Sequence, residues 1–585
     1  MTSNAFMTSN YLRLFLWAAL GVALFLNYEA WVADYPTAPT TGQTAHPGHT
    51  GAEGSGFGES VPHASSSTPA AARSSSAQSA SSVAVAPAAA APSTAATASL
   101  ATAPTIRVQT DVLDVQLSLE GGTLVRAALL KYHPEKGETE PVVLESRASP
   151  ASPQKLYLLE SGLTGPDDAA RPTHLAHFTS AATEYRLAPG ADELKVPLTW
   201  TDGHGVTVTK TYRLRRASYE IDVDQSVNNG SDMPWAAATY AKILRYETPS
   251  HGSMFSYSAD RSFHGPAIYD GNKYRTLNIT KSEDQNLRVD VSGGWMAAPE
   301  HDFVSAVIPP ADAPFRYTLG VQGNEFDLAM AGPTRTVAPD STADFSFKLY
   351  VGPKLRSQLA ATAPELGRVN DYGRLYFLAQ PLFWLLEKFH AFFGNWGVSI
   401  IIVTVLLKLL FYPLSEASYR SMARMKALAP RIKSIQETFK DDKEKAGRAV
   451  MELYKREKVN PVAGCLPMII QLPIFIAFYW VLLESVEMRQ APFFGWINDL
   501  SSRDPYFILP AIMAVAMFVQ YKLNPAPPDP TQAKVMMIMP IAMSAMFAFF
   551  PAGLTLYYVV NTILSIAQQW NINRRIEASA GRQKA

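Results

Sequence analysis

The sequence predicts a membrane protein that joins an antiparallel β domain to an α-helical core. Residues 106–352 alternate apolar and polar side chains between turn dipeptides, as half-buried strands do. Five apolar segments of near-spanning length follow residue 395, and another apolar run lies close to the N-terminus. These observations predict five C-terminal transmembrane helices, an N-terminal anchor helix and a β domain between them.

Residues 1–35 are predicted to form an uncleaved transmembrane anchor. Their apolar run extends from Leu14 to Leu26 and approaches the roughly 20 residues that a spanning helix needs. A cleaved signal peptide is the alternative, but Tyr28 or Trp31 would then occupy a position before the cut where small residues are preferred. Residues 36–105 are almost entirely Ala, Ser, Thr, Pro and Gly, which predicts a disordered linker.

The region 106–352 is predicted to be a large antiparallel β-sandwich. Between residues 206 and 214, apolar side chains alternate with threonines and an arginine. Dipeptides that tolerate the positive φ of hairpin turns occur at Asp202-Gly203, Asn229-Gly230 and Asp270-Gly271. Alternation between such turns is typical of sandwich strands.

Residues 365–393 are predicted to form an amphipathic helix that lies on a membrane surface. Apolar residues such as Leu382, Phe383 and Leu386 follow a 3.6-residue period, while Glu387 and His390 occupy other faces. The alternative is an ordinary helix that packs on the preceding sandwich.

The region 394–575 is predicted to hold five transmembrane helices, at about 396–414, 464–486, 505–522, 535–550 and 554–571. The loop 415–463 carries twelve Lys and Arg residues, whereas the loop 487–504 carries two. Because positively charged loops stay in the cytoplasm, the first loop is predicted to be cytoplasmic. Alternation then places the β domain in the periplasm and both termini, including the basic tail 576–585, in the cytoplasm.

The loop 415–463 is itself predicted to be a helical hairpin, because its apolar residues step by three or four. Pro430 should kink the first arm or start a new helix. A basic hairpin beneath a membrane could contact a nascent chain, ribosomal RNA or anionic lipid, or it could only fix the topology.

Lys408 is the most informative single residue, because it interrupts an apolar segment. An ammonium at that depth costs roughly 2.5–3.5 kcal/mol on insertion scales, so something must compensate it. Lys408 lies five residues before Pro413, so the side chain could simply extend to the membrane surface. Thr404, four residues earlier, shares its helical face and begins a polar stripe.

The last predicted helix extends this polar stripe. Its polar residues recur at intervals of three and four, at Tyr557, Tyr558, Asn561, Thr562, Ser565, Gln568 and Gln569. Such groups must face other helices or water, and Gln471 in the third span is a further candidate. Hydrogen bonding between helices is the structural alternative for each one. Together with a buried cation, they favour a hydrated groove open to the cytoplasm.

Two motifs resemble the YidC family of membrane insertases. The segment KREKVNPVAGCLP at 455–467 is followed by QLPIF at 471–475, and FPAGL at 550–554 precedes Tyr557 and Tyr558. The resemblance covers about 365–575, and the anchor, the linker and the large β domain are similar to the Gram-negative members.

The resemblance implies a bacterial inner-membrane insertase and chaperone that inserts nascent membrane proteins alone or beside the Sec translocon. It also implies a periplasmic β-supersandwich and a positively charged groove whose central cation is normally arginine, where this chain has Lys408. The groove residues carried over or predicted from the stripe are Lys408, Thr404, Gln471, Phe475, Tyr557, Tyr558, Asn561 and Ser565. The expected partners are nascent membrane proteins, the Sec translocon, the ribosome through the hairpin and basic tail, and membrane lipids.

Neither enzymatic activity nor a cofactor is expected. The sequence lacks a phosphate-binding Gly-rich loop, its single Cys465 cannot form an intrachain disulfide, and His174 and His177 are too weak a pair to predict a metal site. Two rival functions remain open at this point. A transporter would also need buried polar residues, and a tethered periplasmic enzyme or lectin for carbohydrates would also have an anchored β domain.

Overall fold

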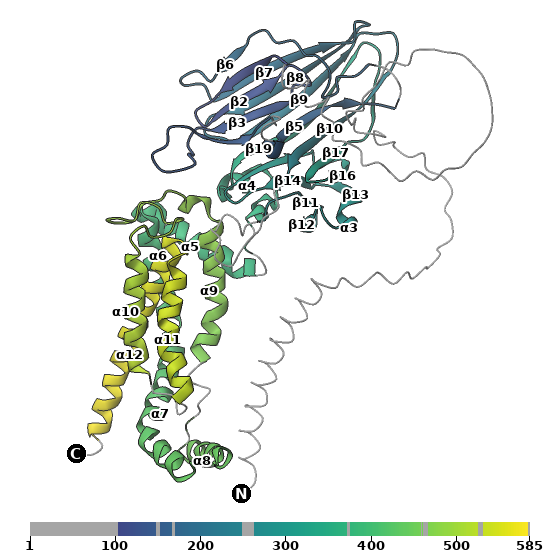
Figure 1. Cartoon of the computed structure of the whole chain (residues 1–585). Coiled ribbons are helices and arrows are strands. Elements are labelled where there is room, and N and C mark those ends of the chain that lie inside the picture. Colours follow the sequence, from purple (N-terminus) through teal and green to yellow (C-terminus); the bar gives the residue numbers. More distant parts are fainter. Residues whose placement is uncertain are drawn as a thin grey trace, which may run out of the picture. The chain divides into compact units, whose positions relative to one another are not determined.

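The computed structural model describes residues 103–147, 153–166, 170–247, 263–370, 372, 375–440, 442–457, 459, 466–524 and 530–582 (Figure 1). The predicted anchor, 1–35, and nearly all of the predicted linker, 36–105, lie outside these residues.

The β domain contains two large sheets, as predicted for a sandwich. The first has the order β13-β16-β17-β10-β5-β3-β2-β1-β6, with β18 beside β10 and β4 beside β3. Its strands are β1 (Thr105–Gln109), β2 (Leu113–Ser118), β3 (Leu124–Leu129), β4 (Val142–Glu145), β5 (Tyr157–Thr164), β6 (Glu184–Arg186), β10 (Trp235–Tyr246), β13 (Arg288–Ser292), β16 (Pro314–Gln322), β17 (Glu325–Ala331) and β18 (Arg335–Val337). The pairing is antiparallel except between β1 and β6.

The second sheet has the order β12-β11-β14-β15-β19-β9-β8-β7, and all its pairings are antiparallel. Its strands are β7 (Glu193–Thr201), β8 (Val206–Arg215), β9 (Glu220–Asn229), β11 (Ala267–Tyr269), β12 (Tyr274–Thr276), β14 (Trp295–Pro299), β15 (Phe303–Ile308) and β19 (Ser341–Pro353). Short helical turns occur at η1 (Pro153–Lys155) and α3 (Ser282–Gln285).

The predicted alternation is visible in β8, where Val206, Val208, Tyr212 and Leu214 are buried. Two predicted turns also form: Gly203 lies between β7 and β8 with φ +75°, and Gly271 lies between β11 and β12 with φ +86°. Glycine adopts these left-handed conformations without a steric penalty. The apolar residues of β8 therefore face the core, and the dipeptides at Gly203 and Gly271 reverse the chain between paired strands.

The β domain continues beyond residue 352, where the sequence alone placed its end. Helix α4 (Arg356–Thr362) and the turn η3 (Leu366–Val369) contribute Leu359, Leu366 and Val369 to the same buried cluster as the strands. This segment has no strand alternation, so only its packing assigns it to the domain.

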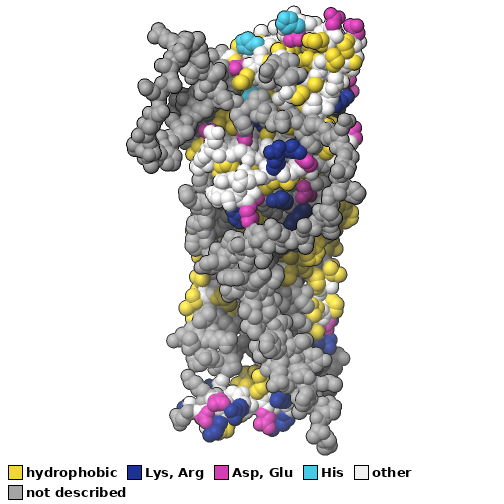
Figure 2. Space-filling view, turned by 90° about the vertical axis from the view of Figure 1, so that its right-hand side faces the viewer, with side chains coloured by type: hydrophobic (Ala, Val, Ile, Leu, Met, Phe, Trp, Pro, Cys, Tyr) yellow, Lys and Arg dark blue, Asp and Glu magenta, His cyan; other side chains and the backbone are white. Residues whose placement is uncertain are grey.

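The helical region contains α5 (Tyr376–Phe393), α6 (Trp396–Leu410), α7 (Tyr412–Thr438), α8 (Lys443–Arg456), α9 (Leu466–Glu484), the turn η6 (Val486–Met488), α10 (Ile508–Leu523), α11 (Pro530–Phe547) and α12 (Ala552–Arg582). Each of the five predicted C-terminal spans thus contains a helix. Hydrophobic side chains lie along this region, and charged ones gather at the end where Figure 1 places α7 and α8 (Figure 2).

Among the described residues, no single helix has the length and continuous apolar character to cross a bilayer by itself. The helices α6 and α7 reach that length and character only together, and they meet at a bend of 65°. Shorter apolar helices cover 471–484, 508–523 and 537–547.

Helix α5 begins at Tyr376, eleven residues later than the segment 365–393 predicted. Of the preceding residues, Leu366 and Val369 complete the β domain, while Tyr372 already packs on the helical core. Its apolar face packs on the helical core through Ala379, Phe383 and Leu386. On its outer side, Phe377 is 67% exposed and Phe392 is 82% exposed. The helix therefore has one apolar face packed on the helical core and further apolar side chains exposed on its outer side.

The predicted hairpin is formed by α7 and α8. Leu428 and Ile432 on α7 form a small apolar cluster with Leu453 on α8 and with Val459, which follows α8. Pro430 neither ends α7 nor starts a new helix, since α7 continues to Thr438.

Candidate functional site

A polar hollow lies within the helical region, between α6, α7, α9 and α12. It is lined by Thr404, Leu407, Lys408, Phe411, Leu414, Ser415, Gln471, Ile474, Tyr557 and Asn561. Five of these residues, Thr404, Lys408, Gln471, Tyr557 and Asn561, are among the eight predicted groove residues.

Lys408 points into the helical core. Its Nζ donates a hydrogen bond to Ser565 Oγ on α12 at 2.7 Å, and Ser565 Oγ donates to the Asn561 carbonyl at 2.7 Å. The side chain is half-buried. Its ammonium therefore contacts a hydroxyl of a neighbouring helix in this structure, which places the cation beside the polar stripe.

A second polar contact joins the opposite walls of the hollow. Gln471 Nε2 on α9 donates to Asn561 Oδ1 on α12 at 2.7 Å. Thr404 is buried, and its hydroxyl donates to the Ile400 carbonyl of its own helix at 2.6 Å. Asn561 thus links α9 to the turn of α12 that holds Ser565, because its side chain and its carbonyl have different partners.

Three of the predicted groove residues, Phe475, Tyr558 and Ser565, do not line the hollow but contact residues that do. Phe475 stacks on Tyr557 with ring centroids 6.1 Å apart and meets Tyr558 edge-on at 5.5 Å. Tyr558 also contacts Phe547, with centroids 4.8 Å apart. Phe475 and Tyr558 form an aromatic wall between α9, α11 and α12. Ser565 is not part of the lining of the hollow, but it hydrogen-bonds Lys408, which is.

The hollow is narrow. Its cavity volume is about 20 Å³. A water molecule needs roughly 10–15 Å³ by this measure, so there is room for about one. A polypeptide segment can enter only if the surrounding helices separate.

Sequence reasoning missed the wall formed by the bend residue Phe411 and the start of α7. Phe411, Leu414 and Ser415 line the hollow, as do Leu407 on α6 and Ile474 on α9. Ser415 lies on α7, beyond the 65° bend that separates this helix from Lys408 on α6, so helical spacing from Lys408 does not identify it. The apolar members carry no signal in the sequence either.

The comparisons with known proteins cover both parts of the chain. Residues 105–385 match the family model described as the YidC periplasmic domain, and residues 388–579 match the model described as a 60Kd inner membrane protein. These matches define a bacterial inner-membrane protein with a periplasmic β domain.

Curated relatives specify the family. A membrane protein insertase YidC from Nitrosococcus oceani is 42% identical over 569 residues, which cover 97% of this chain and 99% of the relative. Another, from Thioalkalivibrio sulfidiphilus, is 48% identical, and the match covers 81% of this chain and 85% of the relative. The chain belongs to the YidC family of membrane protein insertases.

Two solved structures are also similar. One is an active YidC insertase with its first transmembrane domain resolved, at a TM-score of 0.35 and 19% identity, covering 80% of this chain and 94% of that chain. The other is a galactose mutarotase related enzyme from Lactobacillus acidophilus, at a TM-score of 0.30 and 11% identity, covering 42% of this chain and 97% of that chain.

The family assignment confirms the predicted resemblance, the combination of a β domain with a helical core, and the insertase function. The protein acts as an insertase rather than an enzyme, which also removes the transporter and carbohydrate-enzyme alternatives. Its substrates are nascent membrane proteins. The roles of the individual groove residues remain predictions.

Proposed function

We propose that the hollow around Lys408 receives a short polar or acidic segment of a nascent membrane protein while the neighbouring apolar segment moves sideways into lipid. The observation that carries this proposal is the 2.7 Å hydrogen bond from Lys408 Nζ to Ser565 Oγ, since it turns a cation inward among polar side chains. A hydroxyl is a neutral partner, so a substrate carboxylate can replace it with a gain in attraction.

The proposed mechanism requires no covalent chemistry. A polar segment that crosses bare lipid loses its hydrogen bonds to water, whereas the groove offers it polar partners and a positive charge. Burial of the apolar segment in lipid then supplies the driving force. Because the hollow holds about one water molecule, the groove must first widen. Phe411, at the bend between α6 and α7, is where a small rotation of α7 would do so.

We further propose how the chain is oriented in the membrane and which partners it contacts, based on its basic segments and its exposed apolar side chains. The basic hairpin 415–463 and the tail 576–585 would face the cytoplasm and contact the ribosome, with both termini on that side. On α5, the exposed Phe377 and Phe392 support contact with membrane lipids, and Lys388 lies 5.9 Å above the Trp384 ring, a pairing suited to the interface. Action beside the Sec translocon is part of the same proposal.

Photocrosslinking tests the groove. A stalled nascent chain with one transmembrane segment is presented to the protein carrying a photoreactive residue at Thr404, Gln471 or Tyr558. Val515 on α10, which is 65% exposed and outside the hollow, is the control position. Adducts at the three test positions in clear excess over Val515 are expected. Equal labelling at all four positions would contradict a shared substrate path.

A further inference from the structure

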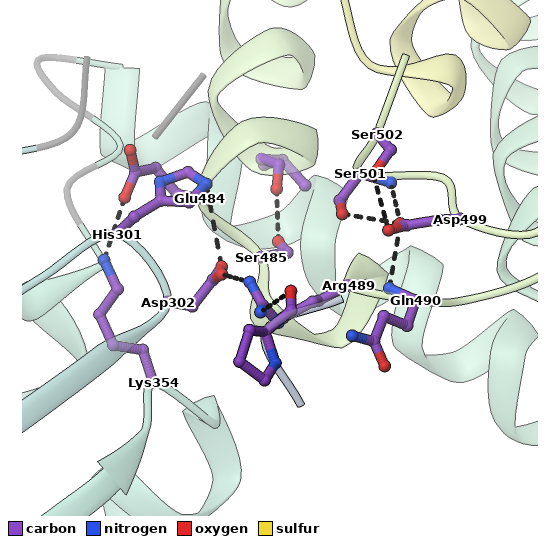
Figure 3. A network of polar contacts seen from close by, with 12 residues as sticks. His301, Asp302, Lys354, Glu484, Ser485, Arg489, Gln490, Asp499, Ser501 and Ser502 are labelled. Carbon is purple, nitrogen blue, oxygen red and sulfur yellow. Dashed lines mark hydrogen bonds and ion pairs between the residues drawn. The ribbon is translucent and has the colours of Figure 1, made fainter. Parts of the chain in front are cut away.

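A second polar cluster lies at the other end of α9, where the β domain meets the helical region (Figure 3). Lys354 directly follows β19, and Glu484 is the last residue of α9. Their side chains form an ion pair with Nζ and Oε2 3.1 Å apart, and each is only 2% exposed. Lys354 Nζ also donates to the Val369 carbonyl at 3.4 Å. Removing one member of an ion pair so deeply buried leaves an uncompensated charge and is therefore costly.

The same junction contains a second ion pair of opposite polarity. Arg489, five residues beyond Glu484, reaches into the β domain and contacts Asp302 at 2.6 Å. It also donates to the carbonyls of His133 and Pro134 at 2.9 and 3.0 Å. The segment after α9 is thus held at a point that the β domain determines.

Helix α9 has two halves that differ in packing. Toward Glu484 it is buried, with Ala477, Phe478 and Val481 fully enclosed by other helices. Toward the hollow, Leu472 is 54% exposed, and Pro473 lies between the halves. A proline inside a helix removes one backbone hydrogen bond and permits a bend there. The packed half therefore acts as a rigid base for the half that carries Gln471.

We propose that Lys354 is a positioning residue that acts through Glu484 to hold α9 in the register at which Gln471 meets Asn561. The packed half runs from Pro473 to Glu484, which lies eleven residues further on, roughly 16 Å along a helix, so a small tilt at Glu484 displaces Pro473 and with it Gln471, two residues before it. The β domain would in this way set the geometry of one groove wall. This inference rests on the proposed function of the groove.

The test measures the position of α9 directly in the full-length protein in liposomes. Spin labels are attached to cysteines at Leu472 on α9 and Ile563 on α12, both exposed side chains outside the hollow, after Cys465→Ser. The variant Lys354→Met is compared with the control Lys348→Met. Lys348 also pairs with a glutamate, Glu220, at 3.0 Å, but within the β domain.

Lys354→Met is expected to broaden or shift the distance distribution and to reduce nascent-chain adducts at Gln471, while Lys348→Met changes neither. The charge swap Lys354→Glu with Glu484→Lys is expected to restore a narrower distribution than either single change. This rescue separates positioning from a general loss of packing. An unchanged distance in Lys354→Met overturns the proposal, and so does a swap that fails to narrow the distribution.

Two further measurements keep the outcome clear. If Lys354→Met fails to fold, Glu484→Gln, which keeps the side-chain volume, is expected to show a smaller shift in the same direction; no shift overturns the proposal. Adducts at Thr404 in the unmodified protein report the groove independently. Their absence, together with a shifted α9 in Lys354→Met, would refute the proposed groove function and leave the positioning of α9 supported.

Discussion

Replacement of Lys408 by methionine should weaken the insertion of clients that carry an acidic residue beside their transmembrane segment. Methionine keeps a long, unbranched side chain and removes only the charge, so the packing of α6 is largely preserved. Lys408→Arg keeps the positive charge on a long side chain. It is therefore the matched control and should insert such clients at close to the original rate.

The expected magnitude follows from the geometry of the hollow. Lys408 Nζ lies 2.7 Å from Ser565 Oγ, so a client carboxylate that displaced this hydroxyl would make direct contact. At ~4 Å two unit charges attract by ~4 kcal/mol at an effective dielectric constant of about 20, and by ~1 kcal/mol in bulk water. Because the hollow admits water, we expect an intermediate value of ~2 kcal/mol, or about a 30-fold loss of insertion rate.

The assay compares two clients that differ by one substitution, aspartate or asparagine in the translocated segment, inserted into liposomes that contain the purified protein. The aspartate client should lose about 30-fold in rate with Lys408→Met, and the asparagine client should lose far less. An equal loss for both clients would show that Lys408 acts through packing or folding. No loss for either would show that its charge does not contact the substrate.

Three other outcomes are expected. Ser565→Ala removes the hydroxyl that an acidic client must displace from the Lys408 ammonium, so acidic clients should insert at least as fast as with the unmodified protein. Ser565→Thr keeps a competing hydroxyl and should keep the original rate, and a fall with Ser565→Ala would contradict the displacement. Burial raises the pKa of Glu145 in the β domain to about 8, above its ordinary 4.5, so the melting temperature of the domain should fall as pH rises from about 5 to 8. Glu145→Gln should abolish this fall, and a fall of the same size in the variant would refute the assignment to Glu145. The buried Asp504 accepts hydrogen bonds from Trp496 Nε1 and from the backbone amide of Leu509 at the start of α10. Asp504→Ala should therefore destabilise the helical region by ~2–4 kcal/mol, measured by thermal unfolding of the protein in detergent, and Asp504→Asn should destabilise it less.

Local patterns predicted most of the elements. The alternation in β8 and the positive-φ glycines near residues 203 and 271 depend only on which face is buried and which residues tolerate a turn. The same holds for the 3.6-residue period of α5. The start of α5 was placed too early, since Leu366 and Val369 pack into the β domain, whereas Tyr372 and Leu375 already pack on the helical core.

The candidate site likewise contains residues that local sequence patterns predict and residues that only the packing of the helices assigns. The sequence by itself determined that Lys408 and the stripe containing Asn561 and Ser565 needed polar surroundings, because buried charge and unpaired amides are costly in any fold. Only the tertiary structure decided that Phe411 at the bend and Leu414 on α7 close the hollow, and that Lys354 meets Glu484 across 130 residues of chain. An apolar side chain can pack against many different neighbours, and a charged side chain can pair with any residue of opposite charge. Their partners are therefore set by how the helices and sheets pack together, which no local pattern encodes.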